Sequence, residues 1–97
     1  MFARVTHVQA KPEKMGEVVA LYTESVLPVL QQLQGFKATF LLTDPASGKG
    51  MSVTLWESDA DRLAGDSAAA LRGPIVAVMP LLAAPPVAQS FDAISLA

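Results

Sequence analysis

The sequence has no cysteine and no asparagine, and it has one histidine, one tryptophan and one tyrosine. Without cysteine the chain can form no disulfide, no thiolate metal site and no cysteine nucleophile. A single histidine among scattered acids assembles neither a metal-ligand cluster nor a Ser/His/Asp set, so we expect no metal and no other cofactor. Nucleic acid is not expected as a partner, because the net charge is −2 and basic residues form no run.

Charge is scarce throughout the chain. Charged residues make up 16% of the sequence, against about 25% in a typical globular protein. Hydrophobic residues make up 52%, and 97 residues suffice for one domain, which we place over residues 1–97. A small single domain cannot hide that much apolar surface by itself, so we expect a homodimer.

The longest uncharged segment, from Gly73 to Phe91, is the one candidate for a membrane span. A spanning helix needs about 20 apolar residues, and four prolines interrupt this segment. Arg4 and His7 interrupt the N-terminal apolar residues, which excludes the pattern of a signal peptide. We therefore expect a cytoplasmic protein without a membrane segment.

The central feature of the sequence is the segment from Gly50 to Asp61. Met51, Val53 and Leu55 alternate with polar residues and with Trp56, which is the two-residue period of a strand. Ser58 and Asp61 follow in the spacing of a capping box, so a helix should begin there. A strand thus carries the only tryptophan to the rim where strand becomes helix, a common place for a binding site.

Periodicity and turn residues predict the other elements. Pro28 should kink the first helix or end it near Leu27, and Gly73-Pro74 should end the second helix. The chain should pair the second and third strands in a hairpin through Asp44–Gly50. In chain order we predict a strand over 2–10, a helix over 11–34, strands over 36–43 and 51–56, a helix over 59–72, short helical turns within 75–84 and a strand over 87–96.

This β-α-β-β-α-β order predicts a ferredoxin-like α+β fold with a four-stranded antiparallel sheet. The first and third strands should lie in the centre, the second and fourth at the edges. Both helices would cover one face. The other face also carries apolar residues, among them Met51 and Val53, and a second subunit is the simplest cover for it.

The chain resembles the antibiotic biosynthesis monooxygenase-like proteins of the dimeric α/β-barrel superfamily. The resemblance rests on the first strand from Phe2 to Val5, on Leu33-Gln34-Gly35-Phe36, and on Leu55-Trp56-Glu57-Ser58. It implies a homodimer whose sheets pack face to face into a dimeric α/β barrel. Members of this group oxidise aromatic quinols with O2 without metal or flavin, or degrade haem.

Two departures from the family pattern bear on activity. The haem-degrading members pair a tryptophan with an asparagine and a histidine, whereas this chain has no asparagine and carries Asp66 near the place of that histidine. This difference argues against haem degradation. The quinol-oxidising members use an asparagine a few residues before the tryptophan, where this chain has Ser52.

The candidate catalytic residues are His7 and Trp56. Trp56 would either stack on a planar substrate or anchor the core. His7 could act as a general base near neutral pH, although a lone histidine is more often structural. The candidate substrate-binding residues are Trp56, Tyr22, Phe40, Ser52 and Arg4.

Each remaining candidate also has a structural interpretation. Arg4 should point away from His7 across the strand, and its partner could be Glu57, Asp92 or a ligand anion. Tyr22 could hydrogen-bond a substrate or pack in the core, and Phe40 is equally suited to plain core packing.

Three functions remain open on this reasoning. The first is a cofactor-free monooxygenase acting on a small planar aromatic. The second is a non-catalytic dimer that binds a small apolar ligand. The third is a structural or interaction module without a cavity.

Overall fold

The computed structural model describes residues 1–97 and shows the four predicted strands in one antiparallel sheet. The strands lie in the order β2-β3-β1-β4, so β1 and β3 are central, as predicted. Their bounds are Phe2–Gln9 for β1, Phe36–Asp44 for β2, Lys49–Trp56 for β3 and Val87–Asp92 for β4. The ferredoxin-like fold class is confirmed.

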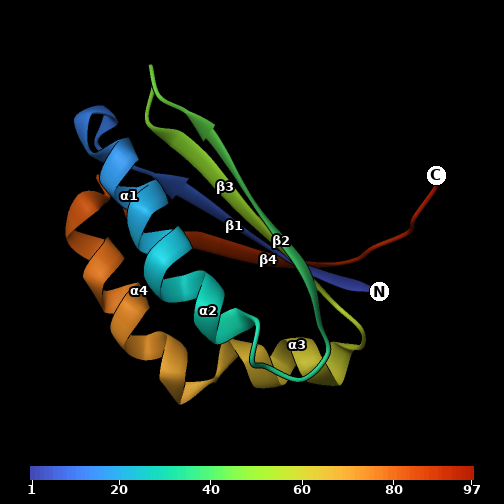
Figure 1. The fold of residues 1–97 in the computed structure, drawn as a ribbon. Helices are drawn as coiled ribbons and strands as arrows, with labels where there is room; N and C mark the ends of the chain where they lie inside the picture. The colour runs from blue at the N-terminus through green and yellow to red at the C-terminus, as the bar shows by residue number, and fades with distance from the viewer.

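The helices all lie on one face of this sheet (Figure 1). They comprise α1 (Met15–Leu21), α2 (Leu27–Leu30), α3 (Asp59–Asp66) and α4 (Arg72–Val78), with 3-10 turns at Pro12–Lys14, Ala69–Leu71 and Met79–Leu81. The C-terminal residues after β4 extend away from the sheet (Figure 1). None of the helices has the length and hydrophobicity of a transmembrane segment.

The first helical segment does not end near Leu27. A π-helical turn at Tyr22–Val26 joins α1 to α2, and the helix continues to Leu30. In this turn the Leu27 N–H donates to the Tyr22 carbonyl, five residues back. Pro28 has no N–H to donate, and the wider turn just before it accommodates the loss. The distortion was therefore predicted correctly, and the early end was wrong.

The predicted second helix over 59–72 is interrupted: α3 ends at Asp66, and a 3-10 turn at Ala69–Leu71 leads into α4. After α3, Ala68 adopts an extended backbone conformation, and the Ser67 hydroxyl bonds back to the carbonyls of Leu63 and Ala64. Serine side chains compete in this way with helix continuation. Pro74 does not end a helix, contrary to the prediction. It lies in the first turn of α4, where a missing N–H costs no helical hydrogen bond.

The last strand is shorter than predicted and ends at Asp92 rather than Leu96. Ile94 and Leu96 lie beyond it and are exposed, so neither packs against the sheet. Register explains the end of pairing, because Asp92 lies opposite Phe2, the first residue of β1. Beyond this pair, the Ala93 N–H donates to the Met1 carbonyl at 2.8 Å, and Met1 is the first residue of the chain.

Two apolar clusters fill the space between helices and sheet. The larger is built from Val26, Leu30, Trp56 and Leu71, and the smaller from Ala10, Met15 and Val18. A bulge at Lys37 shifts the register of β2 against β3. Phe36 consequently packs against Trp56 on the helix side and does not share a face with Phe40, contrary to the alternation expected from the sequence.

Gly35 lies in the turn between α2 and β2, where the sequence predicts the helix to end; the helix in fact ends earlier, at Leu30. The Gly35 φ of +77° lies in the left-handed region, and a Cβ there would come within 2.1 Å of the Asp61 carboxylate. We predict that Gly35→Ala lowers the free energy of unfolding by about 1–3 kcal/mol, measured by urea denaturation. Gly16→Ala is the control, since nothing lies within 4 Å of its Cβ in α1 and helix propensity favours alanine there. Equal effects of the two substitutions would contradict the argument.

Candidate functional site

A cavity of about 210 Å³ lies between the sheet and the helices. Its floor is formed by residues of β1, β2 and β3, and its walls by the first helical segment, α3 and the segment from α4 to Pro86. The lining is mainly apolar, with a few polar groups that come from the sheet and from two helices. This composition is typical of a site that binds a small organic ligand.

Trp56 closes one end of the cavity. It lies at the end of β3, is only 2% exposed, and meets the ring of Phe36 edge to face with centroids 6.1 Å apart. Its indole lies directly against α3, where Gly65 leaves room for the ring. The buried Nε1–H has no acceptor in the protein, and an unmade buried hydrogen bond costs about 1–3 kcal/mol. Trp56 is therefore both a core anchor and a cavity wall.

A row of polar side chains crosses all four strands, two residues before Trp56 on β3. Its members are Thr39, Thr54, Arg4 and Ser90. Register places Thr54 opposite both Thr39 and Arg4, and Arg4 opposite Ser90. Side chains opposite one another on neighbouring strands share a face, so this row faces the helices. Tyr22 Oη lies 2.7 Å from Thr39 Oγ1, which lies 3.0 Å from Thr54 Oγ1. Three hydroxyls are thus linked from the first helical segment to β3.

At the other end of the row, Arg4 forms an ion pair with Asp66. The expected partners, Glu57 and Asp92, are both wrong, because the loop between β3 and α3 leads the chain back so that Asp66 lies over β1. Asp66 also binds Arg62 Nη1 at 3.0 Å, and Arg62 donates to Ser90 at 2.8 Å. Asp66 is the one carboxylate that lines the cavity, and two guanidinium groups neutralise it.

The next row of the sheet floor holds two hydroxyls side by side. Ser52 and Thr6 are opposite one another on β3 and β1, and both line the cavity. Ser52 is a predicted site residue, whereas Thr6 was missed. Its signal was present in the sequence, because Arg4 and Thr6 share strand parity and must face the same side.

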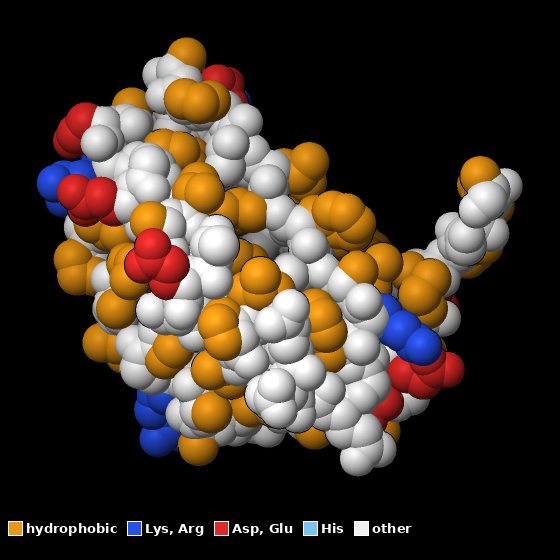
Figure 2. Space-filling view, viewed as in Figure 1, with side chains coloured by type: hydrophobic (Ala, Val, Ile, Leu, Met, Phe, Trp, Pro, Cys, Tyr) orange, Lys and Arg blue, Asp and Glu red, His pale blue; other side chains and the backbone are white.

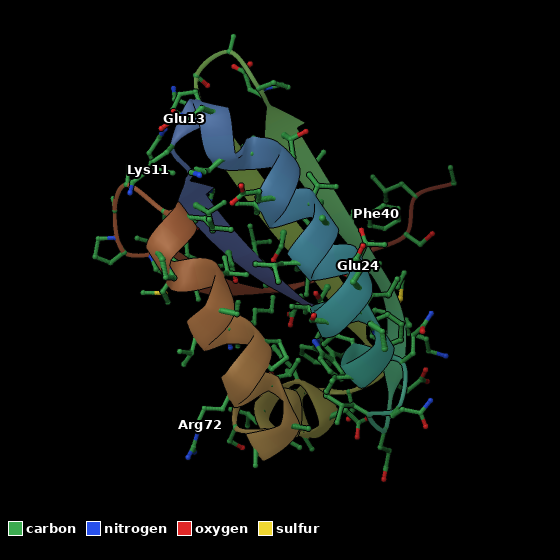
Figure 3. All side chains as sticks on the ribbon, turned by 60° about the vertical axis from the view of Figure 1, so that its left-hand side comes forward. Lys11, Glu13, Glu24, Phe40 and Arg72 are labelled. Atoms are coloured by element: carbon green, nitrogen blue, oxygen red, sulfur yellow. The ribbon has the colours of Figure 1, made fainter.

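The structure does not bring His7 or Phe40 to the cavity. His7 lies opposite Met51 on the other face of the sheet, is exposed, and its Nε2 lies 3.2 Å from Gln89 Oε1. Phe40 is 57% exposed on the same face of the sheet as His7, so it does not pack in the core either. Figure 3 shows it beyond β2, on the side away from the helices. Trp56, Tyr22, Ser52 and Arg4 do line one cavity.

Two further observations define the electrostatics near the site. Lys37 Nζ lies 2.5 Å from a Glu57 carboxylate oxygen, and this contact lowers the pKa of the exposed Glu57 below its ordinary value. No group of three or more potential metal ligands occurs anywhere in the structure. The residues that line the cavity include hydroxyl and guanidinium donors.

Comparison with known proteins adds the fold context. No model of a protein family matches the sequence, and no curated protein matches it either. Several solved structures share its fold. A monooxygenase from the gene ActVA-Orf6 of Streptomyces coelicolor, in complex with the ligand nanaomycin D, superposes with a TM-score of 0.83 at 19% identity and covers 99% of this chain and 89% of its own.

Two other structures cover as much of the chain. An antibiotic biosynthesis monooxygenase superposes with a TM-score of 0.78 at 19% identity, over 98% of this chain and 100% of its own. The NE2512 protein of unknown function from Nitrosomonas europaea gives 0.80 at 20% identity, over 99% and 91%. The resemblance inferred from the sequence is thus confirmed at the level of fold.

The contact between Trp56 and Gly65 gives a prediction about this site. A Cβ at position 65 would come within 2.5 Å of the indole ring. We expect Gly65→Ala to lower the free energy of unfolding by about 1–3 kcal/mol, since a rigid ring must move. Helix propensity alone gives the opposite sign. Urea denaturation followed by Trp56 fluorescence measures the effect, and Gly73→Ala, which meets nothing within 4 Å, is the control.

Proposed function

From a fold shared with antibiotic biosynthesis monooxygenases, we propose that this protein is a cofactor-independent monooxygenase that oxidises a small planar aromatic compound with O2. The observation that carries the proposal is the mainly apolar cavity whose lining brings together Trp56, Tyr22, Ser52 and Arg4. An apolar lining with a few hydroxyl and guanidinium donors suits an aromatic ring that carries oxygen atoms.

Cavity size limits the substrate. Drug-sized ligands occupy pockets of about 300–1,000 Å³, whereas a cavity of about 150 Å³ holds benzene. The 210 Å³ found here lies between these values. A compound of two fused rings fits this range better than one of four.

The proposed chemistry needs a ligand that can become an electron-rich anion. For an anthrone-like ring CH2, transfer of a proton to Asp66, the one carboxylate of the cavity lining, gives an enolate that reacts with O2. One oxygen atom then stays on the ring carbon as a carbonyl, and the other leaves as water. Arg4, Ser52 and Tyr22 supply polar contacts to the ring oxygens in this proposal, and Trp56 holds the ring plane.

His7 has no part in this proposal, since it lies on the opposite face. Tyr22 and Asp66 are the titratable groups other than Arg4 in the cavity lining, and Asp66 is paired with two arginines. Because neither Tyr22 nor the paired Asp66 is a strong base for removing a proton from a substrate, a second candidate function is binding of a planar ligand in the cavity without turnover. Oxygen consumption separates the two.

Oxygen uptake with anthrone and with naphthalene-1,4-diol tests the monooxygenase. We expect uptake above the protein-free blank, and a loss of at least about tenfold in Trp56→Ala, because about 1.4 kcal/mol of lost stacking is enough for that factor. His7→Gln is the matched control and should leave the rate unchanged. Ligand-induced changes in Trp56 fluorescence without oxygen uptake would leave binding alone as the function.

We further propose that the apolar face of the sheet away from the helices, called here the open face, pairs with a second copy of the chain. It carries Phe40, Leu42, Met51, Val53, Leu55, Val87 and Phe91. Only 11 of 97 residues are buried in the single chain, and Phe40, Leu42, Val87 and Phe91 of this face are each at least half exposed. Figure 2 shows hydrophobic side chains along the strands and also over α4. Monomers rarely leave a contiguous apolar face of this kind in water.

Replacing Phe40 by glutamate tests this pairing. A charge buried within an apolar interface has no partner there, so Phe40→Glu should convert a dimer to a monomer. Light scattering after size exclusion gives the mass. Val76→Glu is the control, because Val76 is equally exposed on α4, on the helix side. A wild-type protein that is monomeric at micromolar concentration would contradict the pairing.

A further inference from the structure

The segment after β4, residues 93–97, is called here the arm. The Ala93 N–H donates to the Met1 carbonyl at 2.8 Å and holds the base of the arm beside β1. Beyond this bond the arm projects from the sheet on the side away from the helices (Figures 1 and 2). Ile94 and Leu96 are 79% and 92% exposed, so two large aliphatic side chains have no cover in the single chain.

The open face has a hollow at its other end, beside the turn that joins β2 to β3. A row that crosses all four strands lies in this hollow, because Met51 is opposite both Leu42 and His7, and His7 is opposite Val87. The arm starts where β1 begins, whereas the hollow lies where β1 ends. Arm and hollow therefore occupy opposite ends of the same face.

The symmetry of a homodimer can bring these two features together. A two-fold axis that lies between two facing sheets and runs across the strands places each end of one copy over the opposite end of the other. Each arm then meets the hollow of its partner, and both contacts form at once. An extended chain of five residues spans up to about 17 Å, and packed sheets lie about 10 Å apart, so the arm can reach the partner's face.

The size of the open face also favours a contribution from the arm. Strands of six to nine residues, four in number, cover about 500 Å² in plan. Pairing by the strands alone would thus bury about 1,000 Å² in total, whereas stable interfaces bury about 1,200–2,000 Å². Two arms, each with Ile94 and Leu96, bring the pair into that range.

We infer that the arm of each copy lies across the hollow of the other, with Ile94 and Leu96 against the partner's Leu42, the partner's Met51 and the partner's Val87. This inference rests on the proposed pairing of the open faces. It goes beyond that pairing, because it fixes the direction of the two-fold axis and names the segment that crosses between the copies.

Charges placed in the arm test the contact without disturbing the fold, because both side chains are exposed in the single chain. We expect Ile94→Asp and Leu96→Asp each to raise the dimer dissociation constant at least about tenfold, which is less than the effect of losing one buried Ile or Leu side chain. Sedimentation equilibrium measures the constant. Ser95→Asp is the matched control, since it adds the same charge to the same arm at a polar position, and it should change the constant by less than about threefold.

The absence of cysteine allows the position of the arm to be measured directly. Leu96→Cys and Leu42→Cys are prepared separately, mixed and treated with a short bismaleimide, and peptide mapping identifies the linked pair. We expect a link between positions 96 and 42 in the mixture and none in Leu96→Cys alone, because the two arms lie at opposite ends of the dimer. Leu96→Cys mixed with Val76→Cys, on the helix side, is the control and should not link.

The outcomes separate this inference from the pairing on which it rests. A dimer that Phe40→Glu dissociates but that Ile94→Asp and Leu96→Asp leave intact keeps the pairing and overturns the role of the arm. A dimer in which position 96 links to itself, or does not link to position 42, overturns the placement of the arm in the hollow. A monomeric wild type removes the pairing and the arm contact together, and oxygen uptake still decides the monooxygenase proposal.

Discussion

The alternation of side chains along the two central strands is the constraint on which the rest of the structure depends. On β3, Ser52, Thr54 and Trp56 face the helices, and the intervening apolar residues face away. A one-residue slip would exchange these two sets. The helix-facing side is thus polar in its centre and cannot be packed as a plain apolar core, whereas the opposite side is apolar without a cover in the single chain. The cavity and the open face therefore both follow from the alternation of side chains along the central strands.

The polar centre of the helix-facing side is costly unless its groups find partners. Thr54 finds one through Thr39, and Arg4 finds one in Asp66. Arg62 extends this pairing to Ser90 on the edge strand, so the charges link α3 to β1 and β4. The first helical segment, through Tyr22, and α3, through Arg62 and Asp66, are therefore attached to the sheet by polar contacts beside the cavity as well as by apolar packing around it. Such networks favour one arrangement of helices over sheet.

Much of the fold could be predicted from sequence because its signals are local. Alternation predicted the strands, and chain order predicted the sheet topology, whereas Gly35 marked the turn before β2 and not the helix end, which lies at Leu30. The errors arose where local signals compete with tertiary structure. Gly73-Pro74 has the composition of a helix stop, but Pro74 is tolerated in a first turn, and the bulge at Lys37 could not be inferred from a regular period. Of the site, Trp56, Tyr22, Ser52 and Arg4 were predictable. Asp66 and Thr39 were not, because their roles depend on which strands and helices meet.

The π-helical turn at Tyr22–Val26 has a consequence for chain length. Val18, Tyr22, Val26 and Leu30 all line the cavity, and they are spaced by four residues. In a uniform α-helix, a period of four drifts by about 40° at each step, or about 120° over the three steps. The wider turn takes up part of that drift and keeps all four on one side. An insertion or deletion in this turn would rotate everything before it by about 100°, so the number of residues here is as constrained as their identity.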